Sequence, residues 1–189
     1  MPVIVGKSYP RTQTPVFVGS LKYVIFHPFW DIPHQITVHE ILPKWRADPD
    51  YLARNHFEIV RGQQVIAGQS LTPAVLAALT GGELRMRQQP GDDNSLGAIK
   101  FMLPNAHAIY LHGTPARQLF TQSRRAFSHG CIRVADPAAL AAYVLRNVPG
   151  QWDAQKIADT LQQGRTLRVN LTQPIPVMIL YGTALATEA

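Results

Sequence analysis

The sequence predicts a mainly β fold with flanking helices and an inserted small α/β subdomain. Short runs of β-branched and aromatic residues recur near both ends, and glycine, proline or serine separates them, which is typical of short strands. The region from about residue 38 to 89 differs, because helical patterns become frequent there. The 189 residues are 46% hydrophobic and 16% charged, a balance that suits one globular domain with an insertion.

Three short strands are predicted before the insertion, at residues 3–6, 16–18 and 23–26. The segment FHPFWDIP, residues 26–33, follows the third strand. It contains too much proline and too many aromatic residues for a helix, so we predict an ordered loop.

The inserted region is predicted to combine short helices with a hairpin. EILPKWRADPDYLARN favours short helical turns, and FEIV followed by QVIAG favours a small hairpin. LTPAVLAALTGG predicts a longer helix, with Thr72 as its N-cap, Pro73 as its first residue and Gly81 as its C-terminal stop.

Strands and two helices are predicted for the second half of the chain, after the turn-forming segment PGDDNSLG. Asp136 and Asp153 are the expected N-caps of the helices, and Gly164 is expected to end the second one. The predicted elements are strands at 99–103, 108–112 and 128–134, helices at 136–147 and 154–163, and strands at 167–171 and 177–181.

The net charge of +6 and the pI near 9.8 favour anionic partners. The basic residues are dispersed, with Arg124-Arg125 as the longest block, and no nucleic-acid-binding motif is present, so nucleic acid is not the expected partner. No apolar run approaches the ~20 residues of a membrane span, and the first residues lack the pattern of a signal peptide. VIVGK directly after Met1-Pro2 resembles the inside of a strand, so we expect a chain truncated at its beginning.

The single cysteine, Cys131, is the candidate nucleophile, since a thiolate needs a nearby base or positive charge. If its segment is extended, His129 shares a face with the thiol. His112, followed by Gly113, ends another predicted strand and reaches Cys131 if the two strands are neighbours. Taken alone, Cys131 could instead be a small apolar core residue.

Two neighbours of the cysteine have a chemical reason to be there. Gly130 would let a substrate approach the backbone, so that the Cys131 amide faces a developing oxyanion. Arg133 can share the face of Cys131, favour its thiolate and bind a carboxylate with two hydrogen bonds. Seven histidines with one cysteine and no HExxH or CxxC spacing predict no metal site.

His112, fifteen further residues and then SHGCIR resemble the catalytic signature of the L,D-transpeptidases. VIVGKSYPRTQTPVF, YVIFHPFWDIP, EILPKWRADPDYLARN, PGDDNSLGAIKFMLPN and IYLHGTPARQLF resemble the larger periplasmic branch of that family. The resemblance implies one β-sandwich catalytic domain over residues 1–189, with residues 38–89 as a capping subdomain. It also implies that the chain lacks segments at both ends, because members of this branch begin further upstream and continue past Tyr181.

The resemblance implies a role for each residue of the signature. Cys131 is the nucleophile, His112 accepts and donates the proton, and the carbonyl of Gly113 orients His112. His129 supports the site, and the amides of Gly130 and Cys131 form the oxyanion hole.

Further residues are expected to contact the substrate, and no metal or organic cofactor is implied. The Tyr110 hydroxyl is an oxyanion-hole candidate or an inward-facing strand residue. Candidate substrate-binding residues are Arg133, Tyr110, Ser128 and Phe127, and Lys100, Arg117, Arg124 and Arg125 would attract stem-peptide carboxylates. For Phe29 and Trp30 we favour core positions beneath the cap over a cleft wall.

The implied reaction is a two-step acyl transfer in the periplasm or cell envelope of a bacterium. Cys131 attacks the bond before the terminal D-alanine of a peptidoglycan tetrapeptide stem, and an amine then takes the acyl group, which links two third-position diamino acids. Carbapenems are expected to acylate the same thiol. A hydrolytic cysteine carboxypeptidase or amidase and an inactive wall-binding module remain alternatives, and no oligomeric state is predicted.

Overall fold

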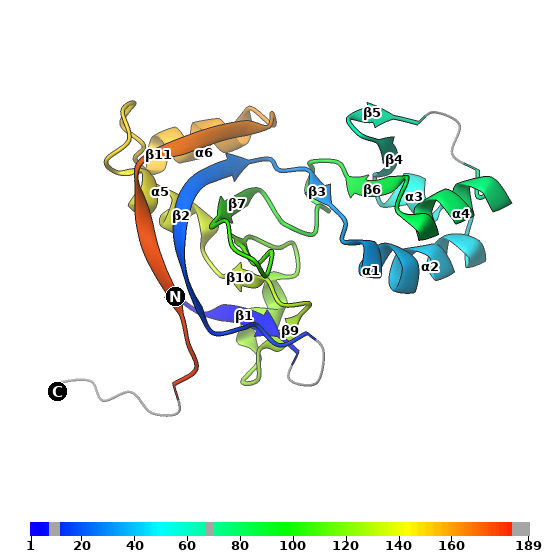
Figure 1. Cartoon of the computed structure of the whole chain (residues 1–189). Coiled ribbons are helices and arrows are strands. Elements are labelled where there is room, and N and C mark those ends of the chain that lie inside the picture. The colour runs from blue at the N-terminus through cyan, green and yellow to red at the C-terminus, as the bar shows by residue number, and fades with distance from the viewer. Residues whose placement is uncertain (8–11, 67–69, 183–189) are drawn as a thin grey trace.

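The computed structural model describes residues 1–7, 12–66 and 70–182. These residues form two sheets with helices beside them (Figure 1), so the predicted mainly β class with flanking helices is confirmed. Every helix within the described ranges is too short or too polar to span a bilayer.

The larger sheet has seven strands among the described residues, and its strands β2 and β11 curve together along one side of the molecule (Figure 1). β1 lies between β9 and β10, which belong to the second half of the chain. In spatial order the strands are β11 (Leu167–Ile179), β2 (Phe17–Phe26), β7 (Ile99–Met102), β8 (Leu111–His112), β10 (Ile132–Val134), β1 (Val3–Gly6) and β9 (Ala126–Ser128).

One face of this sheet packs against helices α5 (Pro137–Leu145) and α6 (Ala154–Gln162). Phe26, Phe101 and Leu145 are fully buried in the shared core, and burial of one such side chain stabilises the fold by about 1.5–3 kcal/mol. The predicted N-caps are confirmed, since the carboxylates of Asp136 and Asp153 accept backbone amides at 2.9 and 2.8 Å.

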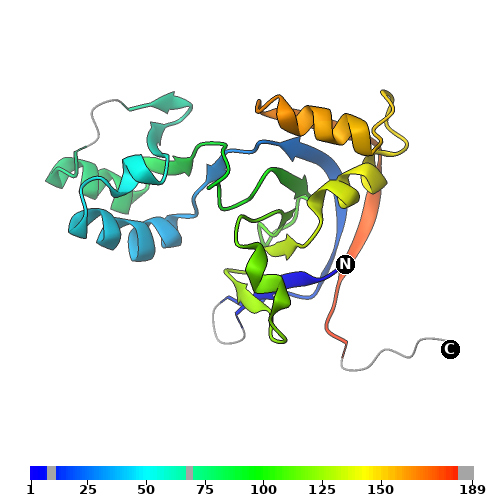
Figure 2. The same ribbon diagram turned by 180° about the vertical axis from the view of Figure 1, so that it is seen from behind.

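A second, smaller unit begins at Trp30 and has its own sheet and core, which includes Trp45, Ile59 and Met86. Figures 1 and 2 show it beside the larger sheet, to which β2 and the segment after β6 connect it. Its description as a cap over the active site stays a prediction. Its elements are β3 (Trp30–Asp31), α1 (His34–Ile36), the π-helical turn η1 (Thr37–Ile41), α2 (Leu42–Ala47), α3 (Tyr51–Arg54), β4 (Phe57–Arg61), β5 (Gln64–Val65), α4 (Pro73–Gly81) and β6 (Arg85–Gln88).

Inside this unit the local predictions hold with small changes. The hairpin of β4 and β5 forms, although residues 67–68 of its second predicted strand lie outside the described residues. The Thr72 hydroxyl caps α4 by accepting the Val75 amide. Gly81 is the last helical residue, and Gly82, with φ of +81°, is the left-handed residue that ends the helix. Strand β6 was not predicted, and β3 lies within the predicted loop.

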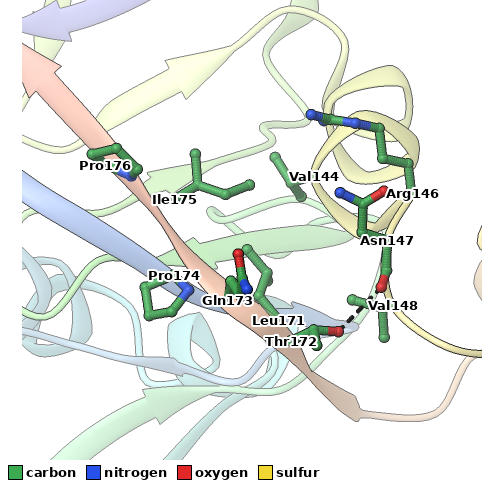
Figure 3. Close-up of a pocket in the computed structure, with 10 residues that line it drawn as sticks. All are labelled: Val144, Arg146, Asn147, Val148, Leu171, Thr172, Gln173, Pro174, Ile175 and Pro176. Carbon is green, nitrogen blue, oxygen red and sulfur yellow. Dashed lines mark hydrogen bonds between the residues drawn. The ribbon is translucent and has the colours of Figure 1, made fainter.

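Two pairs of predicted strands each merge into one longer strand. Residues 17–18 and 23–26 belong to β2, and residues 167–171 and 177–179 belong to β11, because these two strands pair with each other over most of their length. Their register shifts between Asn170 and Ile175, where β11 bends. A pocket of about 320 Å³ lies between this bend and the end of α5 (Figure 3), and the Thr172 hydroxyl donates to the Asn147 carbonyl at its edge.

Two predictions around the candidate nucleophile are wrong. The expected strand at 128–134 is two strands, β9 and β10, with residues 129–131 between them, because Gly130 has a φ of +120° that a regular strand does not allow. The strand expected at 108–112 begins only at Leu111, since Ala108 has a φ of +54° and the Asn105 side chain binds the backbone of the preceding turn.

Candidate active site

Three neighbouring strands bring the candidate catalytic residues to one face of the larger sheet. Lys100 of β7 lies opposite His112 of β8, and His112 lies opposite Arg133 of β10. Tyr110 and Cys131 come directly before β8 and β10, and Cys131 interacts electrostatically with Lys100 and Arg133. The rings of Tyr110 and His112 are 5.7 Å apart, and the Lys100 Nζ lies 3.9 Å from the centre of the Tyr110 ring.

Cys131 lies at the entrance to β10, outside both hydrophobic cores. Its side chain is half-buried, with Sγ 3.8 Å from the Ala108 carbonyl oxygen. The hydroxyl and the backbone of Tyr110 both interact with the thiol. Cys131 therefore lies among polar groups rather than in either hydrophobic core.

His112 is 5% exposed and held by the backbone. Its Nδ1 lies 2.6 Å from the carbonyl oxygen of Gly113. A carbonyl can only accept a hydrogen bond, so the proton of the neutral ring is on Nδ1. The other ring nitrogen, Nε2, then carries the free electron pair that a general base needs.

Burial sets the protonation states of both groups. It lowers the pKa of His112 to about 3, helped by the charges of Arg133 and Lys100, although hydrogen bonds to the carbonyls of Gly113 and Leu96 favour the protonated ring. It also raises the pKa of the Cys131 thiol, against the opposing effects of Tyr110, Lys100 and Arg133. At pH 7 the resting site therefore holds a neutral thiol and a neutral imidazole.

The raised pKa of Cys131 predicts slow alkylation at neutral pH. The rate of modification by iodoacetamide should be below that of a free cysteine at pH 7 and should still be rising above pH 9, because only the thiolate reacts. Mass spectrometry of quenched time points from pH 6 to 10 measures this profile. A plateau reached below pH 8 would instead reveal a preformed thiolate–imidazolium pair.

The loop before Cys131 is held by hydrogen bonds of its own. The Ser128 hydroxyl donates to the Cys131 carbonyl at 2.5 Å and accepts the Gly130 amide at 3.1 Å. The Gly130 amide is thus bonded to Ser128 in this structure, and its place in an oxyanion hole stays a prediction. The Cys131 amide remains as a backbone donor, and Tyr110, whose pKa is raised by burial and by the Cys131 charge, keeps its hydroxyl proton and can be a second donor.

His129 binds a carboxylate of the smaller unit rather than the Cys131 thiol, which is its neighbour in the sequence. Its Nε2 lies 2.6 Å from the Glu40 Oε1 of η1, in the smaller unit. The extended conformation that would have brought His129 to the thiol is broken at Gly130. His129 belongs to the loop of residues 129–131, between β9 and β10, which carries the candidate nucleophile and is called the nucleophile loop below. Through its contact with Glu40, His129 connects this loop to the smaller unit.

Positive charge surrounds the thiol. Arg133 and Lys100 both interact electrostatically with Cys131, and burial lowers the pKa of each. The Arg133 Nε is a buried nitrogen without a hydrogen-bond partner within the described residues. The other expected cations lie elsewhere: Arg117 is in the 3₁₀ helix η2 (Arg117–Thr121), and Arg125 binds the carbonyls of Val3 and Gln122.

Aromatic residues border this face. Trp30 packs against the core of the smaller unit, as favoured, and it also interacts with the Tyr110 hydroxyl, which brings it near the candidate site. The Arg87 guanidinium lies over the Phe29 ring, with its carbon Cζ 4.3 Å from the centre of that ring. Phe127 is a half-buried residue of β9, two positions before His129.

Sequence reasoning missed two residues that touch the nucleophile loop. Glu40 contacts His129, and Thr14 donates a hydrogen bond to the Gly130 carbonyl at 2.8 Å. Both are distant from residues 128–131 in the sequence, and the segments that resemble the family at Thr14 and Glu40 do not mark either residue as part of the site. Only the packing of the elements could have identified them.

Comparisons with known proteins match the chain to the same family that its sequence resembles. The model of the YkuD family, the L,D-transpeptidase catalytic domain, matches residues 1–177. A Haemophilus influenzae protein described as a candidate L,D-transpeptidase is 34% identical over 185 residues, which are 96% of this chain and 36% of that protein. The chain thus spans about a third of the length of this relative.

Proposed function

The chain belongs to the L,D-transpeptidase family, and on that premise we propose that it transfers acyl groups between peptidoglycan stem peptides through Cys131. One observation carries the proposal: three adjacent strands place a buried histidine between two cations, and the lone cysteine lies directly before the third strand and interacts with both cations. Such an arrangement offers a nucleophile, a proton acceptor and sites for substrate carboxylates within one site. We place this activity in the bacterial cell envelope, where its substrate is found.

In the first step, Cys131 attacks the carbonyl of the third residue in a tetrapeptide stem. His112 Nε2 takes the thiol proton as Sγ bonds to the carbonyl carbon, and the Cys131 amide and Tyr110 hydroxyl bind the oxyanion. The bond to the terminal D-alanine then breaks, and the protonated His112 gives its proton to the leaving amine. A thioester and free D-alanine are the products.

In the second step, an amine replaces the thiol. His112 accepts a proton from the attacking amine, the carbon–sulfur bond breaks, and Cys131 recovers its proton. We propose the side-chain amine of a neighbouring stem as acceptor, so that two third-position diamino acids become cross-linked. Neither step requires a metal or an organic cofactor in this scheme.

Lys100 and Arg133 are the proposed anchors for the substrate. Each lies beside Cys131, so a carboxylate bound there belongs to a residue close to the scissile bond. The buried Arg133 Nε offers a donor that no described residue uses, and a guanidinium can bind a carboxylate through two parallel hydrogen bonds. In this scheme Ser128 stabilises the conformation of the nucleophile loop rather than binding the substrate, since its hydroxyl bonds to the backbone of Gly130 and Cys131.

The proposal predicts a covalent adduct with a carbapenem. The thiol should open the β-lactam ring, so that the protein gains the full mass of the drug on the peptide that contains Cys131. Intact-mass and peptide mass spectrometry measure this. Failure of the folded protein to form any adduct over hours at millimolar drug would contradict the enzymatic proposal and favour the wall-binding alternative.

Incubation with a tetrapeptide stem and a D-amino acid separates transfer from hydrolysis. Transfer should give a tetrapeptide that carries the added D-amino acid, and the product is identified by its mass. A tripeptide as the sole product would show that water is the acceptor, which is the behaviour of a carboxypeptidase.

A further inference from the structure

The hydroxyl of Thr14 is buried against the nucleophile loop, although Thr14 and Gly130 are 116 residues apart in the sequence. Thr14 is 1% exposed. Its Oγ1 donates to the Gly130 carbonyl at 2.8 Å and accepts the Gly6 amide at 2.9 Å. Both hydrogen-bonding roles of this hydroxyl are therefore occupied by backbone groups.

The Gly130 carbonyl belongs to the same peptide group as the Cys131 amide. A trans peptide is planar, and its C=O and N–H point in opposite directions. When Thr14 fixes the carbonyl of Gly130, it also fixes the direction of the Cys131 N–H. That N–H is the backbone donor left for an oxyanion, because the Gly130 amide is bound to Ser128.

Thr14 itself has little freedom to move. Strand β1 ends at Gly6, where any Cβ would collide with the Thr12 carbonyl, so the chain around Thr14 packs tightly on the end of this strand. The Tyr181 hydroxyl donates to the Thr14 carbonyl at 2.7 Å and links it to the segment after β11. The Gly130–Cys131 peptide is thus connected through Thr14 to the end of β1 and to the segment after β11.

We propose that Thr14 is a positioning residue that aims the Cys131 amide at the oxyanion of the acylation step. The inference rests on the proposed function, because it needs Cys131 to be acylated. Thr14 touches neither the thiol nor the substrate in this arrangement, and it acts through the peptide group that it orients. Loss of its hydroxyl should therefore slow acylation without changing the reactivity of the thiol towards a reagent that forms no oxyanion.

Two rates measured on the same protein test this inference. In Thr14→Val the carbapenem acylation rate should fall by about 10- to 100-fold, somewhat less than when an oxyanion donor is removed outright. Alkylation by iodoacetamide at pH 9 should stay within about twofold of the unchanged chain, since displacement at a saturated carbon needs no oxyanion hole. Thr14→Ser keeps the hydroxyl and should restore most of the acylation rate.

Thr12→Val is the matched control, because Thr12 belongs to the same segment and its hydroxyl donates to the exposed carbonyl of Lys7, at 3.3 Å, rather than to the Gly130 carbonyl. It should leave both rates unchanged. Thr14→Ala is the second variant if Thr14→Val does not fold, since the smaller side chain leaves room for a water molecule beside the two backbone groups. Circular dichroism establishes that each variant is folded.

The outcomes are distinguishable. Equal acylation rates in the unchanged chain and in Thr14→Val, or in Thr14→Ala if that variant is used, would overturn this inference and leave the proposed function standing. A parallel fall of acylation and alkylation would also overturn it, because the effect would then lie on the thiol. Absence of acylation in the unchanged chain would overturn the proposed function itself.

Discussion

Replacement of Cys131 by alanine is expected to abolish carbapenem adduct formation and D-amino-acid exchange, with a loss of more than about 10⁴-fold. The expected loss is this large because no other group could carry the covalent intermediate. Cys131 is the only cysteine in the sequence and lies outside both hydrophobic cores. The variant should therefore stay folded, and its thermal unfolding midpoint should change by only a few degrees.

The lone cysteine makes this result easy to interpret. An adduct on Cys131→Ala of the same mass and rate would place the nucleophile on a hydroxyl or an amine and would contradict the proposed mechanism. Loss of the adduct together with loss of the folded circular dichroism spectrum would indicate a structural position for Cys131. Cys131→Ser then serves as a comparison, since it preserves the size of the side chain.

His112→Gln is expected to slow acylation by about 10²- to 10⁴-fold at pH 7, the range typical of a lost general base. The raised pKa of Cys131 is the physical reason, because few thiolates form at this pH unless a base removes the proton. The loss should shrink as the pH rises, since the thiolate then forms without help. Stopped-flow or quenched acylation rates from pH 6 to 10 measure both effects.

His129→Gln provides the matched control for this variant. His129 is exposed and bound to Glu40 rather than to the thiol, so its replacement should change the acylation rate by less than about threefold at saturating drug. A larger loss in His129→Gln than in His112→Gln would show that the base has been assigned to the wrong histidine.

Acid should destabilise the folded protein through His112. The pKa of His112 is about 3 in the folded state and near 6.5 in an unfolded chain. Between pH 3 and pH 6.5 the unfolded state therefore binds a proton at His112 that the folded state does not bind. Stability contributed by the neutral ring is therefore lost as the pH falls from about 6.5 towards 3. This direction is independent of the catalytic assignment.

Local signals explain which elements were predictable. Thr72, Asp136 and Asp153 cap their helices as expected, because an N-cap depends on a few adjacent residues. Strand lengths were less predictable, since β2 and β11 extend each other through pairing between distant segments. The turn at Asn105 and the bend at Gly130 shorten strands that the hydrophobic pattern alone would continue.

The candidate site was predictable where it depends on alternation along strands. His112 and Arg133 lie opposite each other because β8 and β10 are neighbours. The sequence predicts both strands but does not show that they pair. The bonding of Gly130, Glu40 and Thr14 was not predictable, since it arises from contacts between segments that no local pattern connects.

The position of β1 between β9 and β10 has a consequence for the order of folding. The loop that carries Cys131 joins two strands that both pair with β1, so its shape depends on contacts between segments that are far apart in the sequence. Such contacts form slowly, because a long chain must first close on itself. We therefore expect the nucleophile loop to be among the last parts of the protein to acquire its native shape during refolding, after the helices of the smaller unit and the hairpin of β4 and β5.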